Sequence, residues 1–67
     1  MNIYEIIRRL KNAQYKSLEA SRIKREIKEL PFSQKREIIS QLRNQKTKSD
    51  NSDIIDVIND IINETDE

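Results

Sequence analysis

The side chains in this 67-residue chain that could do chemistry are carboxylates, amines, guanidiniums and hydroxyls, because the sequence contains no His and no Cys. Asp50, Asp53, Asp56 and Asp60 resemble metal ligands in residue type, but they follow helical spacing and lack the Gly and terminal Glu of an EF-hand loop. The chain has no Gly-rich phosphate loop, and no motif sets a Ser or Lys nucleophile beside a base. We therefore expect a protein that is not an enzyme and that holds no metal or cofactor.

The charged residues are divided sharply along the chain. All 13 Lys and Arg lie in residues 1–48 together with five acids, so that segment carries a net charge of +8. Residues 49–67 hold seven acids and no base, and the net charge of +1 for the whole chain hides this division. A segregation of this kind indicates that charged partners, or the other half of the chain itself, are recognised electrostatically.

The elements that must position these charges are helices. Apolar residues recur with helical period over residues 2–14, 18–30, 34–44 and 54–67. A break near residues 15–17 is expected because the apolar stripes of the first two segments would point in nearly opposite directions on one continuous helix. Pro31 ends the second segment, since the residue before a proline disfavours helical geometry. Ser17 and Ser33 are the predicted N-caps, and we expect Phe32 to pack at the joint between the second and third helices.

The pattern predicts an all-α fold. It consists of a small bundle of three helices, a helical hairpin plus a third helix, followed by a polar linker and a C-terminal amphipathic acidic helix. The predicted division is a basic helical domain over residues 1–43, a linker over residues 44–53 that contains no apolar side chain, and the acidic helix over residues 54–67. The last helix is expected to dock either on the domain or on a partner.

This last helix needs a cover for its apolar face. The face is made of β-branched residues, chiefly Ile54, Ile55, Ile58, Ile61 and Ile62. Branching lowers helix propensity, and the like charges of Asp56 and Asp60 at i, i+4 weaken the isolated helix further. Three covers are available: the chain's own helices, a second copy of the chain, or a foreign protein. The five Ile side chains are therefore a predicted core or partner-binding face.

The basic segment offers candidate contacts to nucleic acid or to an acidic partner, namely Arg22, Arg25, Lys35, Arg36 and Arg43. The predicted third helix carries polar side chains suited to reading base edges, and its short connection to the second helix permits a helix-turn-helix interpretation. The competing interpretation is a solvated face whose cations pair with nearby acids. Stacking on single strands has weak support, because the only aromatic residues are Tyr4, Tyr15 and Phe32.

Two functional hypotheses follow. The first is a small non-enzymatic regulatory protein that acts by protein–protein interaction and inhibits or modulates nucleic-acid-handling machinery. The alternative is a DNA-binding transcriptional regulator with an antitoxin-like layout, in which residues 1–48 bind DNA and the acidic tail tunes that binding. A homo-oligomer held by the Ile faces is a third interpretation. No apolar run exceeds two residues, so we expect no membrane-spanning helix. We also expect a cytoplasmic protein that takes no small-molecule substrate.

Overall fold

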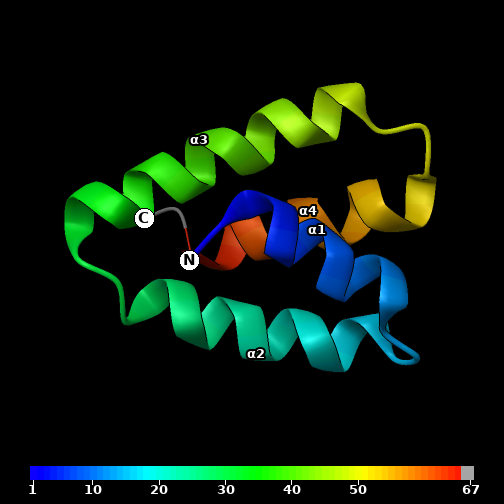
Figure 1. The fold of residues 1–67 in the computed structure, drawn as a ribbon, viewed down its shortest axis with the longest axis horizontal. Coiled ribbons are helices and arrows are strands. Elements are labelled where there is room, and N and C mark those ends of the chain that lie inside the picture. The colour runs from blue at the N-terminus through cyan, green and yellow to red at the C-terminus, as the bar shows by residue number, and fades with distance from the viewer. Residues whose placement is uncertain (66–67) are drawn as a thin grey trace.

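A computed structural model describes residues 1–65, and that part of the chain contains four α-helices and no strand. They are α1 (Ile3–Asn12), α2 (Lys16–Lys28), α3 (Phe32–Lys48) and α4 (Ser52–Thr65). Consecutive helices run in opposite directions, with α2 and α3 along opposite edges and α1 and α4 between them on opposite sides (Figure 1). The prediction of an all-helical chain, with three helices followed by a C-terminal one, is confirmed at this level.

The core of the molecule is aliphatic. Thirteen apolar side chains are buried: Ile3, Ile6, Leu10, Ala20, Ile23, Ile27, Ile38, Ile39, Leu42, Ile54, Ile58, Ile61 and Ile62. Ten of them are Ile, whose stiff side chains lose little further rotamer freedom when they pack between helices. The polar side chain of Thr65 is also buried, and its Oγ1 donates a hydrogen bond of 2.7 Å to the carbonyl oxygen of Ile61. The core therefore contains no unpaired side-chain polar group within residues 1–65.

The chain itself covers the apolar face of α4. Ile54, Ile58 and Ile61 are at most 1% exposed, and α4 makes its most extensive contacts with α2 and α3. Ile62 is also buried, whereas Ile55 is half-buried at the edge of the face. Burial stabilises each such side chain by about 1.5–3 kcal/mol, several times the repulsion of about 0.2–0.5 kcal/mol expected between Asp56 and Asp60. Packing therefore outweighs the poor intrinsic helix propensity of this segment.

The predicted end of the third helix was wrong. Helix α3 continues past Asn44 to Lys48, so residues 44–48 of the predicted linker are helical and only residues 49–51 connect α3 to α4. Residues 44–48 contain no Gly or Pro, and Gln and Lys are good helix formers. Gln45 and Lys46 are half-buried, because the last turns of α3 lie beside the start of α4. Polarity alone was therefore a poor sign of a flexible linker.

The predicted N-caps were also wrong. Ser17 and Ser33 lie inside α2 and α3, which begin after Tyr15 and Pro31 with no side-chain cap. Two asparagines supply the caps that the structure contains. The side chain of Asn2 accepts from the backbone N–H of Tyr4 at 2.7 Å, and that of Asn51 accepts from Asp53 at 3.0 Å and Ile54 at 3.4 Å. These bonds satisfy backbone donors that the first turn of a helix leaves without partners.

Phe32 does not pack at the joint between α2 and α3. Its side chain is 71% exposed, and Leu30 is the apolar residue of this turn that packs against the core. Helix α3 begins at Phe32 rather than after Ser33, so the exposed ring belongs to the first turn of the helix, next to Arg36.

We expect Ile58→Ala to lower the free energy of unfolding by about 2–5 kcal/mol, because the truncation leaves a cavity in a site with no exposure to solvent. Urea denaturation followed by circular dichroism would measure the change. The matched control is Asn63→Ala on the exposed face of the same helix, which should alter stability by no more than about 0.5 kcal/mol. Equal effects of the two substitutions would contradict the burial of α4.

Removing the cap of α4 should have a smaller effect. Asn51→Ala is expected to lower the free energy of unfolding by about 0.5–2 kcal/mol, since two backbone N–H groups lose their acceptor. Asn51→Asp retains an acceptor oxygen and should preserve most of the stability in the same urea titration. A loss of stability in the Asp variant as large as in the Ala variant would rule out the capping role.

Candidate functional site

The structure places the five predicted cationic contacts on two separate helices. Arg22 and Arg25 are exposed on α2, whereas Lys35, Arg36 and Arg43 lie on α3 at the opposite edge of the molecule (Figure 1). Helices α1 and α4 lie between the two edges, so the five residues do not form one continuous patch.

Arg9 of α1 and Arg22 of α2 take part in an ion-pair network. The guanidinium of Arg9 binds Glu19 at 2.6 Å and Glu26 at 2.8 Å, and Arg22 lies 3.8 Å from the other carboxylate oxygen of Glu19. The hydrogen bond to Glu26 is the largest cause of a raised pKa for Arg9, opposed by partial burial and reinforced by Glu19. Arg9 thus stays charged at any working pH and joins α1 to α2.

The second half of α2 faces the acidic helix. Lys24 donates a hydrogen bond of 2.7 Å from its Nζ to Oδ2 of Asp60. One turn further along α4, Glu64 lines a shallow hollow together with Lys24, Arg25 and Lys28 of α2. The positive and negative segments of the sequence therefore contact each other where α2 packs beside α4. The contact neutralises part of the negative charge of α4.

Helix α3 has a different charge balance. It carries five cations and one acid, Glu37. We call Lys35, Arg36, Arg43 and Lys46 the cationic stripe, because at 100° per residue they share an arc of about 100° and extend along about 16 Å of the helix. Within residues 1–65, no ion pair involves Lys35, Arg36 or Lys46. The stripe is thus the closest grouping of four cations on one helix face.

An aromatic ring lies at the N-terminal end of this stripe. The guanidinium carbon of Arg36 is 5.7 Å from the ring centroid of Phe32, a cation–π distance. Phe32, Arg36 and Arg43 are spaced four and seven residues apart, so they project from the same side of α3. The sequence pattern did not predict this pairing of an exposed ring with a guanidinium, because Phe32 was expected to pack at the joint between the second and third helices.

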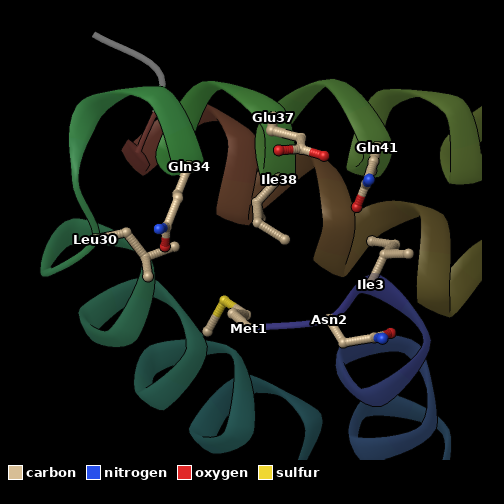
Figure 2. Close-up of a pocket in the computed structure, with 8 residues that line it drawn as sticks. All are labelled: Met1, Asn2, Ile3, Leu30, Gln34, Glu37, Ile38 and Gln41. Atoms are coloured by element: carbon tan, nitrogen blue, oxygen red, sulfur yellow. The ribbon is translucent and has the colours of Figure 1, made fainter.

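The other side of α3 borders a hollow of about 450 Å³ beside the N-terminal segment. Figure 2 shows Gln34, Ile38 and Gln41 directed toward this hollow, with Glu37 on the same side of the helix. Met1, Asn2, Ile3 and Leu30 complete its lining. The side chains that suited a recognition helix are therefore split, because the two glutamines lie here while Arg36, Ser40, Arg43 and Asn44 are exposed elsewhere on α3.

The arrangement of α2 and α3 differs from a helix-turn-helix. In that motif the two helices cross at about 90–120°. Here α2 and α3 run antiparallel along opposite edges (Figure 1). A duplex could meet α3 only through its outer face, without the supporting geometry of the motif.

Residues 1–65 contain neither a cluster of metal ligands nor a membrane-spanning helix. In that part of the chain, no three His, Cys, Asp or Glu residues are grouped closely enough to hold a metal ion. No helix among the same residues is long and apolar enough to cross a membrane. The cationic stripe with Phe32 is accordingly the candidate site, and Lys46 is the member that sequence reasoning left out. The sequence does contain an indication of this: Lys46 follows Lys35 by 11 residues, about three full helical turns, so both side chains lie on the same side of α3.

The Arg9 network predicts a stability difference between adjacent arginines. Arg9→Met should lower the free energy of unfolding by about 1–3 kcal/mol, because charged hydrogen bonds to two carboxylates are lost. Arg8→Met removes an exposed charge that forms no ion pair in residues 1–65 and should change stability by at most about 0.5 kcal/mol. Urea titration of both variants checks this, and equal stabilities would contradict the network's structural role.

No protein-family model, no curated protein and no solved structure matches this chain. A functional interpretation therefore depends on the residues and their geometry alone. Two surfaces differ in their charge: α1, α2 and α4 are joined by ion pairs, whereas α3 carries the cationic stripe.

Proposed function

We propose that this protein is a small non-enzymatic regulator that binds an anionic surface of nucleic-acid-handling machinery through the cationic stripe of α3. The observation that carries the proposal is the concentration of four cations on one arc of α3, with the helix's only acid on the other side. Like charges so close together repel one another, and an anionic partner relieves that repulsion. The surface is suited to binding because it is held on a long, well-packed helix.

The internal use of the other charges supports this choice of surface. Arg9, Arg22 and Lys24 are bound to acids of the same chain. The acidic face of α4 lies beside cations of α2, and the Lys24–Asp60 ion pair joins the two oppositely charged segments of the sequence. Lys35, Arg36 and Lys46 of the stripe form no ion pair within residues 1–65.

The buried Ile face of α4 bears on the alternatives. A detachable acidic tail, as in the antitoxin-like layout, would remove four of the thirteen core side chains when it left residues 1–48. A homo-oligomer held by the Ile faces would have to open the same core. Both alternatives involve a larger loss of buried area than binding through the stripe does, so the stripe is the better supported surface.

The test compares two double variants with equal changes in net charge. Arg36→Gln with Lys46→Gln removes half of the stripe, whereas Arg8→Gln with Lys11→Gln removes two exposed cations of α1. Each tagged full-length protein is used in a pull-down from a native lysate of the source cells, with and without nuclease, and the recovered partner is quantified. We expect the stripe variant to recover about 5- to 30-fold less partner, at roughly 0.5–1 kcal/mol per lost contact.

The control variant should recover the partner as well as the unmodified protein does. Equal recovery by the stripe variant would contradict the proposal, provided that its thermal melt shows it to be folded. The nuclease arm separates a protein partner, whose recovery is unaffected, from one that is held through nucleic acid.

A further inference from the structure

The three aromatic residues of this chain all lie on its surface. Tyr4 is 74% exposed, Tyr15 66% and Phe32 71%, while the core is filled with Ile, Leu and Ala. A single exposed apolar side chain is ordinary on a protein surface. Phe32 differs from the tyrosines because it has no hydroxyl group for solvent to hydrate, and because its ring adjoins the cationic stripe. Its position beside Arg36 makes it part of the candidate site.

The ring and the stripe together match the chemistry of an unpaired nucleotide strand. Arginine guanidiniums and lysine ammoniums bind phosphate oxygens, and the exposed polar side chains of Ser40 and Asn44 on the same helix can donate hydrogen bonds to them. An exposed aromatic ring next to a cationic track is the arrangement on which a base stacks. Phe32 is at one end of a track about 16 Å long.

We propose that the cationic stripe and Phe32 bind single-stranded nucleic acid, with the cations on successive phosphates and one base stacked on the Phe32 ring. This inference rests on the proposed function in one respect, namely that the stripe is the contact surface. It goes further by naming the class of partner. The bound strand would lie along α3 on the side away from the hollow of Figure 2.

The geometry favours a single strand over a duplex. In a duplex each base is stacked on both faces, so a protein ring can stack on a base only after two neighbouring bases have been separated, which costs free energy. The two glutamines that could read base edges in a major groove lie on the hollow side of α3, away from the stripe. An acidic protein is a poorer match as well, because the negative face of the Phe32 ring disfavours a carboxylate above it.

The test measures binding of the full chain to a fluorescein-labelled 20-nucleotide oligo(dT) by anisotropy, beside a 20-base-pair duplex and a labelled poly-glutamate peptide. Phe32→Ala should weaken oligo(dT) binding by about 5- to 150-fold, corresponding to about 1–3 kcal/mol for one stacked base. Phe32→Tyr should bind within about 2-fold of the unmodified protein, since the ring is kept. The matched control, Tyr15→Ala, removes an equally exposed ring outside α3 and should leave the affinity unchanged.

The phosphate contacts have their own signature. With four cations on the strand, the logarithm of the affinity should fall against the logarithm of salt concentration with a slope of about −3, and Arg36→Gln should reduce its magnitude by about 0.7. Phe32→Leu keeps an apolar side chain and removes the aromatic face, so it tests stacking even if the Ala variant loses stability. Thermal melts confirm that each variant is folded.

The outcomes separate this inference from the proposed function. Duplex binding as tight as oligo(dT) binding, with no loss in Phe32→Ala or Phe32→Leu, would overturn the inference. Binding of poly-glutamate but of neither nucleic acid would overturn it too, while leaving the stripe as a contact surface for an acidic protein. If the unmodified protein binds none of the three probes and the pull-down is unaffected by the stripe variant, both proposals fail.

Discussion

The fold depends on the burial of one helix face, the Ile side of α4, between α2 and α3. Ile54, Ile58 and Ile61 are closed off from solvent there, and with Ile62 they form nearly a third of the buried apolar residues. A chain of 67 residues has no disulfide and only a small core, so it has little stability to spare. The face that looked most like a docking surface in the sequence is therefore the part of the core that the other three helices require.

The same contact gives the charge division a structural meaning. When α4 packs against α2, its carboxylates approach the lysines and arginines of α2, as the Lys24–Asp60 pair shows. Opposite charges on the two segments steer the docking, while Ile burial supplies most of its free energy. On α3, Lys35, Arg36 and Lys46 form no ion pair within residues 1–65, so these three cations of the stripe differ from the paired Lys24. We propose that the function resides in the cationic stripe of α3.

The sequence predicted the helices well because their apolar residues recur at helical spacing and because breakers are scarce. It also predicted which side of the last helix is apolar, but not what covers it, since periodicity is a local property and the cover comes from residues 20–42. The predictions for the end of α3 and for the capping residues were wrong, because both features depend on tertiary contacts and backbone geometry. Phe32 shows the same limit: α3 begins two residues earlier than predicted, and the ring expected to pack at the joint is exposed in its first turn.

The most direct measurement of the central claim is native-state amide hydrogen exchange of the full chain. If α4 belongs to the core, the backbone amides of Ile58 and Ile61 should exchange with the same opening free energy as those of Ile23 and Ile27 in α2, close to the global value. Fast exchange throughout α4, while α2 remains protected, would contradict the account. It would mean that the acidic helix leaves the domain readily and that its Ile face is free for another partner.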